Sequence, residues 1–210
     1  YDIFDRVNRG GTPLNKQEMR NALYRGRCTR MLDKLCCSPE FLIATGRSIN
    51  KERMKDQYVV LRAIAFLMLH RGEFKDIPAL QYRGDIDDFL ARFMVYVNDN
   101  APEKLIVDYE NLFIRCMQIS YDLLGENGFR FSGNGIRRPI NMPLFEALSY
   151  LFSFVPEKID YTWASRLILD IESVKEEFDD SRYFSGNIDS TTSVSFRFDR
   201  MDKIINRIQL

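Results

Sequence analysis

Arginines and glycines near the start of the chain have the residue types and spacing of an anion-binding turn. Arg6, Asn8 and Arg9 precede two adjacent glycines, and a helix is predicted to begin soon afterwards at Asn15. Backbone N–H groups at the start of a helix favour anions, and glycines let a phosphate group approach the main chain closely. The stretch lacks the glycine spacing of the phosphate-binding loop and of the dinucleotide-binding fingerprint. An anion or nucleotide site and a purely structural turn are therefore both open interpretations.

Other charged side chains at unusual positions are three arginines and the single histidine. Arg137 and Arg138 stand in a Gly- and Pro-containing loop, where they can clamp a phosphate or simply be solvated. Arg62 lies within the apolar stretch 58–69, so it must meet a carboxylate or extend to solvent, and a structural ion pair is the preferred interpretation. His70 follows that stretch without an evident partner, which favours a helix-terminal surface residue over a catalytic base.

Metal, disulfide and membrane chemistry have little support in the sequence. The four cysteines, of which Cys36 and Cys37 are adjacent, fit neither a disulfide framework nor a metal-binding C-x-x-C motif, and a single histidine argues against zinc. Four reduced thiols predict a cytoplasmic protein. The longest apolar run, 58–69, contains Arg62 and is shorter than the ~20 residues that span a bilayer. No serine has an evident His and Asp partner, so no self-sufficient active site is predicted.

The charge of the chain is balanced overall but unevenly distributed. The sequence contains 30 Lys and Arg residues and 30 Asp and Glu residues. Residues 1–55 hold 12 basic and 6 acidic side chains, a net charge of +6, and the rest of the chain is therefore −6. The neutral total argues against a protein covered in positive charge, whereas the basic N-terminal third keeps a non-catalytic DNA-binding or sensor module open as an alternative. A helical scaffold that oligomerises through its aromatic residues is a further alternative.

The elements that would position these residues are helices. Apolar residues indicate a first helix that stops at Gly10 and Gly11, where glycine permits the left-handed C-terminal conformation. Asn15 and Glu18 then form the asparagine variant of a capping box, and the residues on either side of it supply a hydrophobic staple. This pattern predicts a helix that runs from Asn15 to about Arg25.

Apolar stripes and caps predict the remaining helices. They cover 29–37, a segment after Ser38, 50–70, a segment capped by Asp85, 102–125, a segment from Pro143, 160–179 and a last one from about Thr191. The stripe expected to face inward on 102–125 consists of Leu105, Tyr109, Leu112, Cys116, Ile119 and Leu123. No strand alternation is sustained, and the glycines of 128–141 favour a loop. The sequence thus predicts an all-α, compact bundle of about eight or nine helices.

Residues 3–24 resemble the second signature of the GmrSD restriction-endonuclease N-terminal-domain family, a ParB-like group. The signature reads Phe-x-Arg-x-Asn, then Gly, then Leu, then Gln-Glu-x-Arg-Asn, and it is matched by Phe4, Arg6, Asn8, Gly11, Leu14, Gln17, Glu18, Arg20 and Asn21. The stretches "RMKDQYVVLRAIAFLML" and "RRPINMPLFEAL" resemble the helical region of the family. The resemblance covers most of the chain and is strongest in its first 25 residues.

The resemblance implies a prokaryotic, cytoplasmic DNA-defence protein that binds and hydrolyses an NTP. Residues 1–26 would end the ParB-like nucleotide-binding core, and 27–210 would form a helical domain of this larger α+β protein. The family's Asp-Gly-Gln-Gln-Arg motif lies upstream and is absent here, so the chain is expected to be a fragment. Arg6, Asn8, Gly11 and Arg20 are the expected nucleotide contacts.

The partners follow from the same resemblance. The intact protein would bind an NTP with Mg²⁺, would act on DNA together with a nuclease domain or subunit, and could oligomerise. No cofactor and no metal site are expected within this fragment itself. Arg137 and Arg138 are the candidate contacts to DNA or phosphate.

Overall fold

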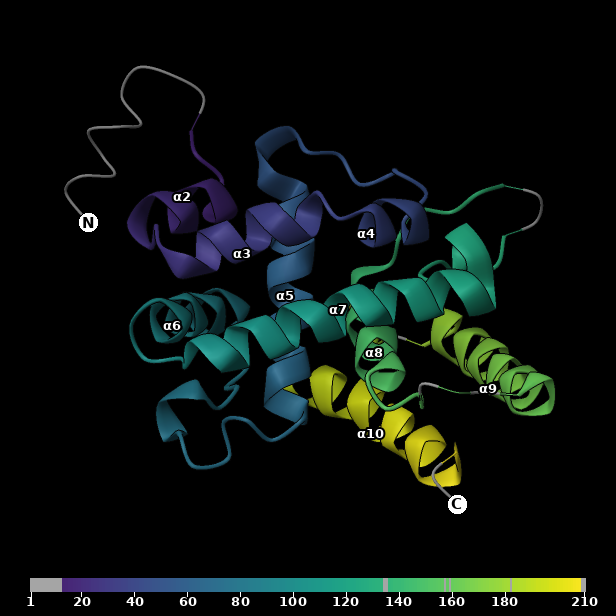
Figure 1. Cartoon of the computed structure of the whole chain (residues 1–210). Helices are drawn as coiled ribbons and strands as arrows, with labels where there is room; N and C mark the ends of the chain where they lie inside the picture. Colours follow the sequence, from purple (N-terminus) through teal and green to yellow (C-terminus); the bar gives the residue numbers. More distant parts are fainter. Residues whose placement is uncertain (1–12, 134–135, 157, 159, 182, 209–210) are drawn as a thin grey trace.

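The computed structural model describes residues 13–133, 136–156, 158, 160–181 and 183–208, and its regular structure within these ranges is helical throughout (Figure 1). These ranges contain nine α-helices: α2 (Lys16–Leu23), α3 (Arg27–Cys36), α4 (Pro39–Ala44), α5 (Lys55–His70), α6 (Ile86–Asp99), α7 (Glu103–Leu124), α8 (Met142–Phe152), α9 (Tyr161–Asp179) and α10 (Thr191–Ile208). Three 3-10 turns, η1 (Glu52–Met54), η2 (Pro78–Leu80) and η3 (Gly125–Asn127), join them. The prediction of an all-α bundle is confirmed.

Two helices, α5 and α8, form the centre of the core. Every side chain of α8 from Pro143 to Phe152 is buried, as is nearly all of α5 from Val59 to Met68. A helix that is apolar on all sides is stable only when other helices surround it. Helix α5 packs against α8 and α3, and α8 also packs against α10 and α7. In Figure 1, α5 runs through the middle of the molecule and α7 crosses it.

The surface-facing helices follow the predicted stripes to different degrees. On α6 the buried residues are those with helical spacing in the sequence: Ile86, Phe89, Leu90, Phe93, Met94 and Val97. On α7 the predicted stripe is correct only in part. Tyr109 and Cys116 are buried as predicted, but the other predicted residues are only partly buried, and their neighbours Ile106, Phe113 and Met117 are buried instead. Helix α7 packs against both α4 and α8, so its buried face is wider than one stripe and is centred between the two neighbours.

The start of α5 differs from the prediction that Asn50 opens this helix. The helix begins at Lys55, after the short turn η1, and both Arg53 (φ 56°) and Met54 (φ 58°) have left-handed backbone conformations. Each such residue other than glycine costs about 1–2 kcal/mol. Arginine and methionine do not favour a left-handed conformation, so the sequence gives no sign that the helix starts at residue 55 and not at residue 50.

The predicted ion pair of Arg62 is confirmed and belongs to a larger buried network. Arg62 Nε lies 2.5 Å from Glu146 Oε1 on α8, and Arg62 Nη2 lies 2.6 Å from Asp189 Oδ1 in the segment before α10. Arg197 Nη2 on α10 lies 2.6 Å from the second oxygen of Glu146. Two buried guanidinium groups therefore share one fully buried carboxylate, and the network joins α5, α8 and α10.

His70 is the last residue of α5, as predicted, but it is half-buried and packs against α10. Its ring stacks on Phe198 of α10, with 3.6 Å between ring centroids and an angle of 11° between the planes. Its Nε2 atom is buried without a hydrogen-bond partner among the described residues. Burial, together with the charge of Arg197, lowers the pKa of His70 to about 3. The imidazole is therefore neutral at pH 7, and the sequence could not reveal this because α10 lies far along the chain.

The glycine-containing segment 128–141 is a loop in its described part, as predicted. None of the helices in the described ranges combines the length and the apolarity that a membrane crossing requires.

Candidate functional site

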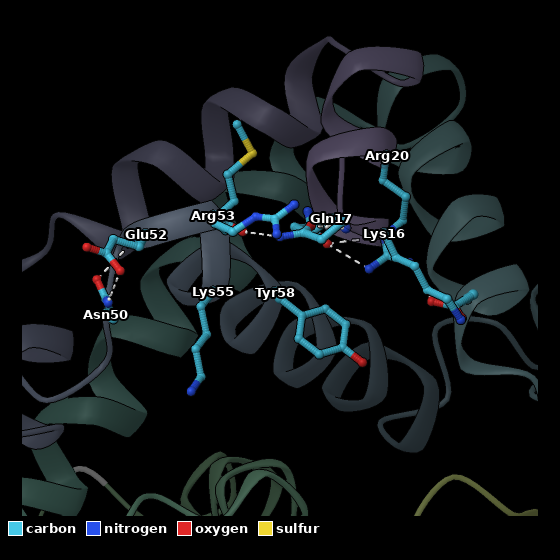
Figure 2. Close-up of a pocket in the computed structure, with 11 residues that line it drawn as sticks. Lys16, Gln17, Arg20, Asn50, Glu52, Arg53, Lys55 and Tyr58 are labelled. Atoms are coloured by element: carbon cyan, nitrogen blue, oxygen red, sulfur yellow. Dashed lines mark hydrogen bonds and ion pairs between the residues drawn. The ribbon is translucent and has the colours of Figure 1, made fainter. Parts of the chain in front are cut away.

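A pocket of about 570 Å³ that is lined mainly by charged and polar residues lies where the N-terminal ends of α2, α5 and α6 meet (Figure 2). We call it the α2–α5 pocket, and its lining consists of Asn15, Lys16, Gln17, Arg20, Asn50, Glu52, Arg53, Met54, Lys55, Tyr58 and Asp87. Four of these side chains are cationic and two are anionic, which gives the lining a formal net charge of +2. Such a surface suits an anionic ligand.

The capping box predicted for α2 is present and forms one wall of this pocket. The side chain of Asn15 accepts hydrogen bonds from the backbone N–H of Gln17 (2.8 Å) and Glu18 (2.9 Å), and Glu18 Oε2 accepts one from the Asn15 backbone (2.7 Å). Asn15 Nδ2 also donates to the carbonyl oxygen of Arg53 at 2.7 Å. The start of α2 is thereby fastened to the strained turn before α5.

Arg20, the described member of the predicted nucleotide contacts, lies in the wall of the pocket. It is 5% exposed, and its guanidinium carbon is 5.4 Å from the centre of the Tyr58 ring. Its Nη1 donates to Asp87 Oδ1 at 2.8 Å, while Nε and Nη2 donate to Gln17 Oε1 at 3.1 and 2.9 Å. The guanidinium is therefore held in one orientation. Its predicted companions Arg6, Asn8 and Gly11 lie outside the described residues.

Lys55 differs from the other cations of the pocket because it has no partner among the described residues. Lys16 is paired with Asp87, and Arg53 Nη2 lies 2.9 Å from Glu18 Oε2. The hydrogen bond from Arg53 lowers the pKa of Glu18. Lys55 is exposed, and in Figure 2 its side chain extends beside that of Tyr58. Its charge is thus available to a ligand without the loss of an existing ion pair.

Backbone strain is concentrated at the rim of the same pocket. Arg53 and Met54, the two consecutive left-handed residues, both belong to the lining. The structure holds them through the bond from Asn15 to the Arg53 carbonyl and through Asn21 Nδ2, which lies 3.2 Å from the sulfur of Met54. Sparsely populated backbone conformations cluster at ligand sites, where the surrounding contacts maintain them.

The predicted phosphate contacts Arg137 and Arg138 line a different pocket, of about 600 Å³, between the end of α7 and α9. Both arginines already have carboxylate partners: Arg137 Nη2 lies 2.9 Å from Glu126 Oε2, and Arg138 pairs with Asp179. In Figure 1, α2 lies on the opposite side of the molecule from α9, which contributes to this second pocket. The structure therefore does not bring the two predicted arginine sites together.

The remaining cations of the second pocket are also occupied. Lys175 Nζ lies 2.9 Å from Glu172 Oε1. Arg130 is 4% exposed and donates to neutral oxygens at the ends of α4 and η3, including the carbonyls of Thr45 and Glu126. These contacts fasten the 128–141 loop to its neighbours, so the α2–α5 pocket is the better candidate for a ligand site.

Of the residues that line the α2–α5 pocket, sequence reasoning predicted only Arg20 as a ligand contact. Lys55, Tyr58 and Asp87 are among those it missed. Lys55 and Tyr58 lie in the "RMKDQY" stretch that resembles the family, but nothing in their own pattern marks them as ligand contacts. Asp87 looks like part of a helix cap, and its side chain reaches Lys16 and Arg20 only because α6 packs beside α2. Only the tertiary arrangement could reveal these contacts.

In the part of the chain that the structure describes, no three His, Cys, Asp or Glu side chains lie close enough together to bind a metal ion. Cys28, Cys36, Cys37 and Cys116 are unpaired thiols. No protein-family model, curated protein or solved structure matches this chain.

Proposed function

We propose that the α2–α5 pocket binds the phosphate groups of a nucleotide, in the helical C-terminal part of a ParB-like, NTP-binding DNA-defence protein. The observation that carries this proposal is the position of Arg20. It is a residue of the signature-like stretch, and it lines a cationic pocket together with Lys55, which has no partner in the described part of the chain. Arg6, Asn8 and Gly11 precede Asn15 in the same stretch, and together with the upstream motif they would complete the site.

The cationic side chains of the lining supply groups that can bind phosphate. Lys55 provides an exposed ammonium group, and Arg20 provides an oriented guanidinium. Lys16 adds a further cation, which is paired with Asp87, so a triphosphate that replaces this carboxylate can make several charge-assisted hydrogen bonds. The ring of Tyr58 offers a flat surface on which a base or a ribose can pack. The pocket thus combines charge for phosphates with an aromatic surface for the nucleoside.

The described residues do not form a Mg²⁺ site of their own. The carboxylates of the described lining are Glu52 and Asp87, and Asp87 is already bound by Lys16 and Arg20. Glu52 accepts a hydrogen bond from Asn50 at 2.8 Å. We therefore assign nucleotide binding to these residues and assign no hydrolytic step to them.

Lys55→Ala tests the proposal without disturbing an internal contact. In the full-length protein, isothermal titration calorimetry with ATP and Mg²⁺ should show affinity reduced about tenfold, the effect of ~1.4 kcal/mol expected from one lost ionic hydrogen bond. Lys51→Ala is the matched control, because Lys51 is an exposed lysine of the same segment that does not line the pocket.

Two results would contradict the proposal. The first is the absence of a binding signal for ATP, GTP, CTP and UTP with the unaltered full-length protein. The second is equal affinity in Lys55→Ala and Lys51→Ala, which would show that the pocket is not where the nucleotide binds.

A further inference from the structure

The carboxylate of Asp87 lies where an anionic ligand of the α2–α5 pocket would have to bind. One of its oxygens, Oδ1, accepts from Arg20 Nη1 at 2.8 Å, and the other, Oδ2, pairs with Lys16 Nζ. Lys16 and Arg20 are one helical turn apart on α2, so a single carboxylate bridges both. The two cations that would hold a phosphate are thus already occupied by an internal anion.

The partners of Asp87 stabilise its ionised form, and its side chain is partly exposed. Burial opposes ionisation of Asp87, but hydrogen bonds from Lys16 and Arg20 outweigh it and hold the pKa of this carboxyl below its usual value. The side chain of Asp87 is 32% exposed, so it can turn toward solvent. The other donors of Arg20 are bound to Gln17, which leaves Nη1 as the group that must change partner.

We propose that Asp87 is an internal competitor of the ligand, whose carboxylate must leave Lys16 and Arg20 before a phosphate group can bind them. This inference rests on the proposed nucleotide site. A ligand carboxylate would only replace one monoanion by another, whereas a phosphate group carries up to two negative charges at pH 7 and gains more from both cations. Asp87 would therefore favour phosphate ligands over carboxylate ligands.

Asp87→Asn tests this role because it removes the charge and keeps the shape. Calorimetric titration of the full-length protein with ATP and with inorganic pyrophosphate should show affinity raised about 10- to 100-fold, since a like charge next to a bound anion is strongly unfavourable. Asp88→Asn is the matched control: Asp88 is in the same turn of α6, but its carboxylate pairs with Arg92, away from the pocket. This control should bind both probes as the unaltered protein does.

The outcomes separate this inference from the proposed function. ATP binding that is equal in Asp87→Asn, Asp88→Asn and the unaltered protein would overturn the role of Asp87 and leave the nucleotide site standing. No ATP binding in any of the three would overturn both. Thermal unfolding without ligand checks that each variant is folded. If Asp87→Asn is not, Asp87→Ser also removes the charge and retains a polar side chain near the start of α6.

Discussion

Glu146→Gln is expected to cause a large loss of stability. Glu146 is fully buried on α8, and its two oxygens bind Arg62 and Arg197 at 2.5 and 2.6 Å. Glutamine preserves the shape but replaces one accepting oxygen by an NH₂ group that faces a guanidinium donor. One buried arginine would lose its partner, and the core would gain an uncompensated positive charge.

The magnitude follows from the burial of both arginines. Removal of one partner from a buried pair costs about 3–5 kcal/mol, because the remaining charge stays in a region of low polarity. The retained glutamine oxygen can keep one of the two hydrogen bonds, and Asp189 still neutralises Arg62. We therefore expect a loss of about 3–4 kcal/mol in the free energy of unfolding, or roughly 6 to 16 °C in Tm for a chain of this size.

Urea denaturation followed by circular dichroism at 222 nm measures this loss, provided that the m value is unchanged. The matched control is Glu177→Gln, since Glu177 is 40% exposed and pairs with Arg200 at the surface, where an ion pair is worth about 0–1 kcal/mol. Adding Arg197→Met to Glu146→Gln should recover part of the loss, because it removes the unpaired charge. A loss below about 1 kcal/mol for Glu146→Gln would refute the reasoning.

Two further predictions concern pH and DNA. Because the pKa of His70 is lowered to about 3 in the folded protein, against about 6.5 when unfolded, the unfolded state takes up a proton first and stability falls as the pH drops. The stability of the unaltered protein relative to His70→Phe should fall by about 2 kcal/mol between pH 7 and pH 5 in urea titrations, and an unchanged difference would contradict this assignment. Four exposed cations have no ion pair among the described residues: Arg25, Arg30, Arg47 and Lys51. If all four contact phosphates of duplex DNA, the logarithm of the binding constant should fall with the logarithm of the salt concentration with a slope of about −3.6. Arg30→Ala should reduce this slope by about one in fluorescence anisotropy titrations, whereas salt-independent affinity would exclude these four residues as DNA contacts.

The sequence predicted those features that depend on neighbouring residues. The capping box of Asn15 and Glu18 could be predicted because each side chain accepts a hydrogen bond from the backbone N–H of the other residue, three positions away. The apolar face of α6 could be predicted because only one side of this helix is buried. An ion pair with a carboxylate was the preferred prediction for Arg62, since a charge within an apolar helix needs a partner unless it extends to solvent.

Features that depend on long-range packing could not be predicted in the same way. Glu146 and Asp189 are far from Arg62 in the sequence, and no local pattern identifies them as its partners. His70 looked solvent-exposed because α10, which covers it, occupies the end of the chain. The left-handed pair Arg53 and Met54 breaks a region that reads as a continuous helix, since the contacts that hold it come from α2.

Tyr58 connects the α2–α5 pocket to the buried ion network, because it contacts both. The guanidinium carbon of Arg20 lies 5.4 Å from its ring centre and that of Arg62 lies 5.5 Å away, while its hydroxyl accepts a hydrogen bond from Arg62 Nη1 at 2.9 Å. Arg62 is in turn fixed by Glu146 and Asp189. The aromatic wall of the α2–α5 pocket is therefore positioned by an ion network in the core. A change at Glu146 that leaves the fold intact should consequently alter the pocket as well as the stability of the chain.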